Sequence, residues 1–170
     1  MLKFNEMSGC FDGKNPPELT LKKRSRTKSI SDLQKAVSGM SGLSDERRMA
    51  VLGLLFLWHD HWTEAHKATD DYEGTPDSDL LHAMVHRREG DYGNSEYWLR
   101  SAGKHPLFGI LGPRVASLLS EDENLREKII PGGKWDAKGF VRAVKDQSDH
   151  PLLREVQAEE FRCFYEYLVN

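Results

Sequence analysis

Apolar side chains recur every three or four residues in several stretches, which is the spacing of amphipathic α-helices. In the first strong stretch the apolar positions include Met49, Leu52 and Phe56. Ser44 precedes them, and a serine side chain at that point can cap the first free N–H groups of a helix. The pattern predicts a helix from Ser44 to about Trp58.

The last stretch of the chain has the broadest apolar stripe. Its members are Val156, Phe161, Phe164, Tyr165 and Leu168. Pro151 stands at the start, where a helix tolerates proline. We expect a final helix from Pro151 to about Leu168 that closes the core.

Between these two helices the same spacing predicts five more. They are expected at 62–71, 79–89, 94–102, 118–129 and 136–147. Gly90-Asp91 and Gly103 mark chain breaks, because glycine accepts the backbone angles that end helices. No stretch alternates with period two for long, and Lys128-Ile129-Ile130 is the strongest strand candidate. The expected fold class is therefore all-α.

The N-terminal part of the chain has a different pattern. Residues 1–30 are rich in Gly, Pro, Asn and Lys, and Pro16-Pro17 blocks regular structure there. A short helix is expected at Ser31–Val37. We expect residues 1–43 to form an extended arm or linker and residues 44–170 to form a single helical domain.

An internal repeat appears when the chain is shifted by 30 residues. The paired positions include Leu52 with His82, Gly53 with Ala83, Phe56 with His86, Asp60 with Gly90, and Ala65 with Ser95. Small residues thus recur where two helices must approach closely. Such repetition is typical of stacked helical hairpins.

The second unit, HAMVHRREGDYGNSEYWLRSAGKHP, resembles a tetratricopeptide unit in its Gly-Asp-Tyr turn and closing proline. The stretch from His82 to Tyr92, followed by Asn94, Tyr97-Trp98 and His105-Pro106, also resembles an uncharacterised helical family of bacterial and fungal proteins. The resemblance extends over most of residues 56–168. It implies stacked helical hairpins closed by C-terminal helices, and it implies no activity.

A candidate metal site lies in the second unit. His82, His86 and Glu89 stand at i, i+4 and i+7, so they fall on one face of a helix. Two histidines with a carboxylate can bind a divalent metal such as Zn, Mn or Fe. His59 is the repeat equivalent of Glu89 and is expected to add a ligand. His66 and His61 are further candidates, with Asp60 orienting an imidazole.

The same histidines have two other interpretations. They take the places of Leu52 and Phe56, so they are expected to face inward and to knit helices together by hydrogen bonds. Alternatively, they act directly in acid–base catalysis.

A small-ligand site is also expected around this hairpin. Its candidate residues are His82, His86, Arg87, Tyr92 and Trp98. Arginine can hold a carboxylate or phosphate by two hydrogen bonds, and the aromatic rings can line a pocket. Ion pairing within the chain and helix packing are the alternatives.

Composition narrows the function only slightly. The net charge of −3 gives no indication of nucleic acid or an acidic surface as partner. The basic segment 22–28 is of a kind that can bind nucleic acid or a membrane surface, but it lacks interleaved aromatic residues and is interpreted as a solvated linker. Two cysteines without a pairing pattern suit the cytoplasm, and neither a signal peptide nor a membrane span is expected.

These observations lead to two functional hypotheses. The first is a soluble protein that binds a protein partner or a small ligand without catalysis. The second is a metal-binding enzyme or sensor that uses His82, His86 and Glu89. Whether the protein is an enzyme stays open.

Overall fold

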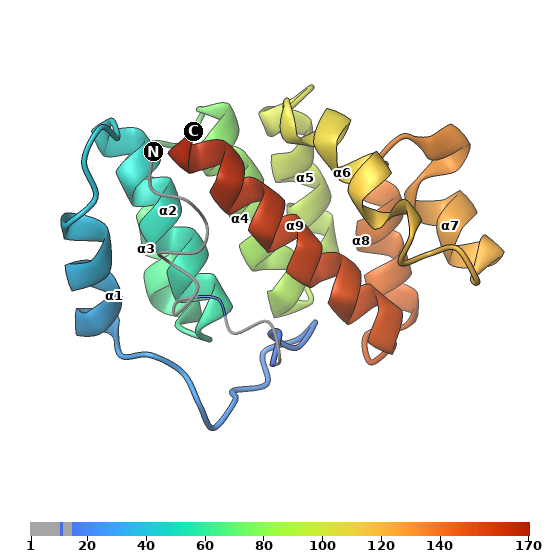
Figure 1. Ribbon diagram of the computed structural model, residues 1–170, viewed down its shortest axis with the longest axis horizontal. Helices are drawn as coiled ribbons and strands as arrows, with labels where there is room; N and C mark the ends of the chain where they lie inside the picture. The colour runs from blue at the N-terminus through green and yellow to red at the C-terminus, as the bar shows by residue number, and fades with distance from the viewer. Residues whose placement is uncertain (1–10, 12–14) are drawn as a thin grey trace.

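The computed structural model describes residue 11 and residues 15–170, and every regular element in that part of the chain is helical. The elements are α1 (Ile30–Ser38), α2 (Asp45–Trp58), α3 (Trp62–Asp70), α4 (Pro76–Glu89), α5 (Tyr92–Ala102), α6 (Leu107–Ala116), α7 (Glu123–Ile129), the 3-10 turn η1 (Pro131–Gly133), α8 (Ala137–Asp146) and α9 (Pro151–Val169). The expected all-α class is confirmed (Figure 1). The first ten residues, where no signal peptide is expected, lie outside the described residues.

Two helical hairpins, α2–α3 and α4–α5, form one half of the molecule. Their turns correspond as the 30-residue repeat predicts, because Asp60 and Gly90 both adopt left-handed backbone angles, with φ of 62° and 80°. α4 packs against both α2 and α3, so the first helix of the second hairpin lies against the whole first hairpin. The relation to tetratricopeptide units stays a prediction.

Small residues allow the helices of each hairpin to approach closely. A Cβ atom on Gly53 would lie 2.6 Å from Leu81 Cδ2 and 2.9 Å from Ala68 Cβ. In the second hairpin the buried Ser95 hydroxyl donates a hydrogen bond to the Ala83 carbonyl at 2.7 Å. The positions that match in the repeat therefore lie at helix contacts.

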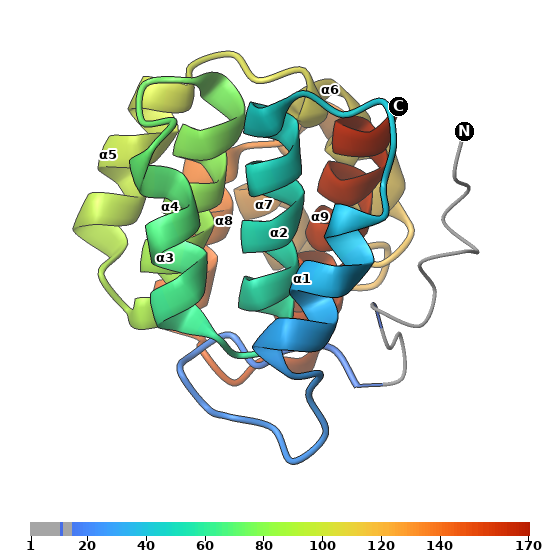
Figure 2. The ribbon, with the colours of Figure 1, turned by 90° about the vertical axis from the view of Figure 1, so that its left-hand side faces the viewer.

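α9 joins the two ends of the molecule. It packs against α2 and α6, and Figure 1 shows it crossing from the α8 end back toward α2. The five residues of the predicted apolar stripe on this helix are all fully buried. Figure 2 shows α1 against α2 at the other end of the row. α8 packs against both α5 and α7.

Several predicted helix bounds are wrong. α4 begins at Pro76 instead of Asp79, because proline suits the first helical position. Asp91, and not Asn94, caps α5, and its side chain accepts a hydrogen bond from the Asn94 backbone. Residues 107–116, for which no helix is predicted above, form α6. The strand candidate at 128–130 lies at the end of α7.

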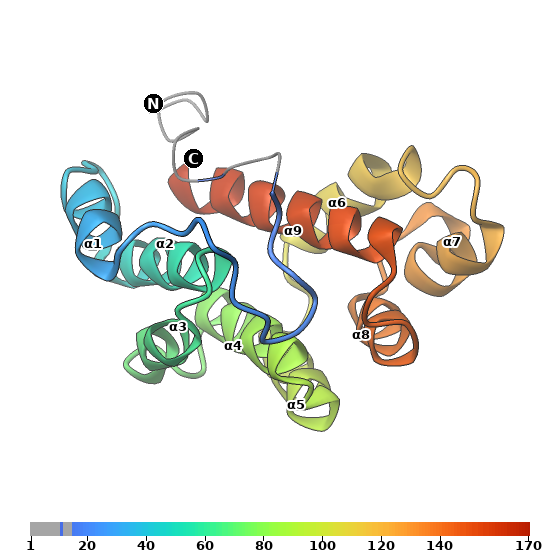
Figure 3. The ribbon, with the colours of Figure 1, turned by 90° about the horizontal axis from the view of Figure 1, so that it is seen from below.

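The segment before α1 is extended and tied to the ends of α2 and α4 (Figure 3). Arg24 binds the Trp58 carbonyl at the end of α2 and the Asp60 carboxylate. Arg88, at the end of α4, donates to the Glu18 carbonyl at 3.0 Å. Buried polar contacts therefore hold this arm on the helices. Of the described helices, none has the length and apolar character needed to cross a lipid bilayer.

Candidate metal centre

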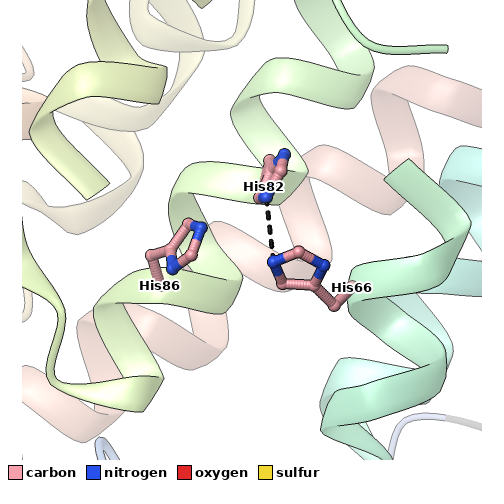
Figure 4. Close-up of side chains that lie close together, drawn as sticks. All are labelled: His66, His82 and His86. Atoms are coloured by element: carbon pink, nitrogen blue, oxygen red, sulfur yellow. Dashed lines mark hydrogen bonds between the residues drawn. The ribbon is translucent and has the colours of Figure 1, made fainter. Parts of the chain in front are cut away.

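Three histidines meet where α3 packs against α4. His66 comes from α3, and His82 and His86 come from successive turns of α4 (Figure 4). One ring nitrogen from each histidine lies within 4.8 Å of the others. The closest pair is His82 Nε2 and His66 Nε2, at 3.1 Å. Among the described residues, this is the one group of three or more His, Cys, Asp or Glu side chains gathered in this way.

Local sequence explains why the rings converge. His82 and His86 are four residues apart, so they lie on the same face of α4. Their rings are stacked with centroids 4.8 Å apart and an interplanar angle of 14°. The His66 ring meets both of them edge-on, at interplanar angles of 81° and 90°. The contact between α3 and α4 therefore brings the third imidazole to the pair.

Trp98 of α5 covers the other side of His82. The two rings are stacked with centroids 4.0 Å apart. Tyr97, the neighbouring residue on α5, meets the Trp98 ring edge-on and is itself 52% exposed. Trp98 thus restricts the orientation of the His82 ring.

Carboxylates lie behind two of the imidazoles. Glu89 Oε2 lies 2.9 Å from His86 Nδ1, although the pair lacks the alignment of a hydrogen bond. Asp70 Oδ1 lies 3.8 Å from His66 Nδ1. A carboxylate at one ring nitrogen orients the imidazole and makes the opposite nitrogen a better metal ligand.

His82 is held in its neutral form. Burial, together with repulsion from His66 and His86, lowers the pKa of its imidazole from 6.5 to about 3. Its Nδ1 is buried without a hydrogen-bond partner. A neutral imidazole is the form that binds a metal.

The structure places His59 outside this cluster. Its Nδ1 accepts a hydrogen bond from the Lys28 backbone N–H at 3.1 Å. The Nε2 atom of His61 lies 2.7 Å from the Lys28 carbonyl oxygen. Asp60 forms buried ion pairs with Arg24 and Arg88. His59 therefore does not join the cluster, whereas His66, one of the further candidates, does.

Arg87 and Tyr92 lie at other places in the fold. Arg87 forms a buried, two-bonded ion pair with Glu160 of α9, with Nη1 3.1 Å from Oε1. Its guanidinium also lies over the Phe140 ring. Tyr92 lines a cavity of about 460 Å³ between α5 and α8, together with Arg142. Neither residue shares a site with the three histidines.

The cluster supports two kinds of contact. Without a metal, the 3.1 Å contact between His82 and His66 is an N–H···N hydrogen bond in which one ring donates and the other accepts. With a metal, the same nitrogens become ligands. Compared with known protein families, curated proteins and solved structures, the chain shows no match.

Proposed function

We propose that this protein binds one divalent transition-metal ion, of the zinc class, between His66, His82 and His86. The observation that carries the proposal is the convergence of three imidazole nitrogens within 4.8 Å. Imidazole is the ligand that zinc and its neighbours in the first transition series share.

The closest pair of nitrogens has nearly the spacing of two ligands on a tetrahedral ion. With Zn–N bonds of about 2.0–2.1 Å, two ligands of a tetrahedral site stand roughly 3.3–3.4 Å apart. His66 Nε2 and His82 Nε2 are 3.1 Å apart. A small ring movement therefore brings both nitrogens to bonding distance of one ion.

The surroundings of the cluster support the same ion. Glu89 lies behind His86, and Trp98 stacks on His82. Both contacts limit ring rotation, so less conformational freedom is lost when a metal binds.

The arrangement favours a binding or sensing role over hydrolysis. Hydrolysis needs a base that activates a metal-bound water. Asp60 is paired with two arginines, and Glu89 lies against His86. Both carboxylates thus have other partners, and neither is free to act as the base. The metal site is therefore proposed for a protein that binds without catalysis.

A zinc titration of the untagged protein against a chromophoric chelator tests this function. We expect one Zn²⁺ per chain, and loss of that site in His66→Ala and in His82→Ala. His150→Ala is the matched control, because His150 caps α9 outside the cluster. Failure of the wild-type protein to compete for zinc, or equal binding by all three variants, contradicts the proposal.

A further inference from the structure

His66, on α3, is the most exposed of the three histidines. The His66 side chain is 36% exposed, whereas that of His86 is 11% exposed. Trp98 covers His82 from α5, so the α5 side is closed by an aromatic ring. An ion held by the three imidazoles is therefore reached from the side of His66.

Three imidazoles fill three of the four positions that a tetrahedral ion prefers. Within the described part of the chain, no fourth His, Cys, Asp or Glu atom belongs to the group. Metal sites with three protein ligands hold water or another small molecule at the remaining position, whereas structural zinc sites use four protein ligands.

We propose that the metal in this site takes a small anion at a fourth position beside His66. The inference rests on the metal binding proposed above. The expected ligand class is a monovalent inorganic anion or a small carboxylate, which enters as the bound water leaves. The exchange changes neither the charge nor the oxidation state of the metal.

Charge in the site explains the preference for an anion. Neutral imidazoles leave the full double positive charge of the ion in place. The nearby carboxylates, Glu89 and Asp70, lie at the Nδ1 atoms of His86 and His66, behind the rings. They orient the ligands and offset the charge only in part. Neither carboxylate belongs to the group of ligand atoms, so an anion at the fourth position completes the coordination and places a negative charge in direct contact with the ion.

The size of the ligand follows from the rings around the ion. The stacked pair of His82 and His86 forms one wall, and Trp98 lies on the far face of His82. These rings leave the side of His66 as the exposed side of the cluster, so we expect a ligand of a few atoms there.

Cobalt substitution tests this inference separately from metal binding. Co²⁺ is added to the untagged, metal-free protein, and the visible absorption bands of the metal are recorded as sodium thiocyanate is added. We expect intense bands on cobalt binding and then a saturable shift in their position and intensity with thiocyanate. His66→Ala should lose the cobalt bands, and His150→Ala should behave as the wild-type protein.

The possible failures are distinguishable. Intense cobalt bands that thiocyanate leaves unchanged overturn the fourth position and leave metal binding intact. Absence of any cobalt or zinc binding overturns both. A thiocyanate response that persists unchanged in His66→Ala assigns the metal to another site and also overturns the inference.

Discussion

His82 and His86 occupy positions that the first hairpin gives to Leu52 and Phe56. Phe56 is 4% exposed, and the two histidines are similarly buried at 6% and 9%. A buried polar atom without a partner costs about 1–3 kcal/mol. Since His82 Nδ1 has no partner, these imidazoles are retained at a cost that an apolar residue would avoid. Metal binding gives a physical reason for that cost.

Glu89 is predicted to strengthen the metal site through His86. Replacing it by Gln keeps the shape of the side chain and removes the negative charge 2.9 Å from Nδ1. We expect Glu89→Gln to weaken zinc binding about 10–100-fold, as loss of such a partner does in other sites. Competition with a chelator measures the change.

Asp70→Asn is the matched comparison. Asp70 is 59% exposed and lies 3.8 Å from His66 Nδ1, so its effect on affinity should be smaller than that of Glu89. Zinc affinity that is unchanged in Glu89→Gln, or reduced more in Asp70→Asn, would count against the positioning role.

Asp60 is predicted to contribute stability as a carboxylate. Burial alone would raise its pKa, but hydrogen bonds from Arg24 and Arg88 outweigh burial and hold the pKa below its ordinary value of 3.8. Removing one member of a buried ion pair costs about 3–5 kcal/mol. Asn tolerates the left-handed backbone of this position, so Asp60→Asn mainly tests the charge.

Urea unfolding at several pH values measures this contribution. Because the folded-state pKa is lowered, the stability gap between wild type and Asp60→Asn should be fully present above pH 3.8. It should shrink as the pH falls from there toward the folded-state pKa. Asp149→Asn, at an exposed position, should match the wild type. A gap that does not change with pH would contradict the assignment.

At the scale of elements, the close approach of α2 to α3 and α4 depends on Gly53. A Cβ atom there would overlap Leu81 and Ala68, and overpacking of this kind costs about 1–3 kcal/mol. Gly53→Ala is therefore expected to lower the free energy of unfolding by that amount in urea titrations.

Gly109 in α6 provides the opposite case. A Cβ atom at Gly109 would meet nothing within 4 Å. Gly109→Ala should raise the free energy of unfolding by about 0.5–1 kcal/mol, because alanine loses less backbone freedom in a helix. Similar effects of the two substitutions would show that α2 and α3 do not approach as closely as described.

α6 also shows where helix prediction from sequence is limited. Its buried residues Leu107, Leu111 and Val115 recur every four positions, which was a helical signal. Pro113 lies inside the helix, and glycines at 109 and 112 further weaken its intrinsic helix propensity. Packing against α9 and η1 outweighs these local preferences. Strongly periodic helices such as α2 and α9 have no such conflict, and the sequence predicted them.

At the scale of the whole molecule, the site depends on how the hairpins stack. The repeat predicted that His82 and His86 face inward from α4, and it predicted where each hairpin turns. Both features follow from local sequence. It favoured His59, which matches Glu89 in the repeat and lies on the α2 side. Since α3 packs against α4, the third imidazole comes from His66. The sequence did contain a signal for this third ring, because His66 lies within α3, the second helix of the first hairpin.

The same stacking explains why Arg87 does not lie beside the histidines as expected. Sequence proximity to His86 suggested a shared ligand, but Arg87 points to α9 and binds Glu160 there. The partner lies 73 residues away in the chain, so no local pattern could reveal it. Contacts of this range, and those of the N-terminal arm, became visible only in the folded molecule.

Anomalous diffraction at the zinc absorption edge, from crystals of the untagged protein grown with Zn²⁺, tests the central claim most directly. We predict one strong peak between His66, His82 and His86, about 2.0–2.1 Å from a ring nitrogen of each. A cluster without a peak, with the His82 and His66 rings still hydrogen-bonded to each other, would contradict the account.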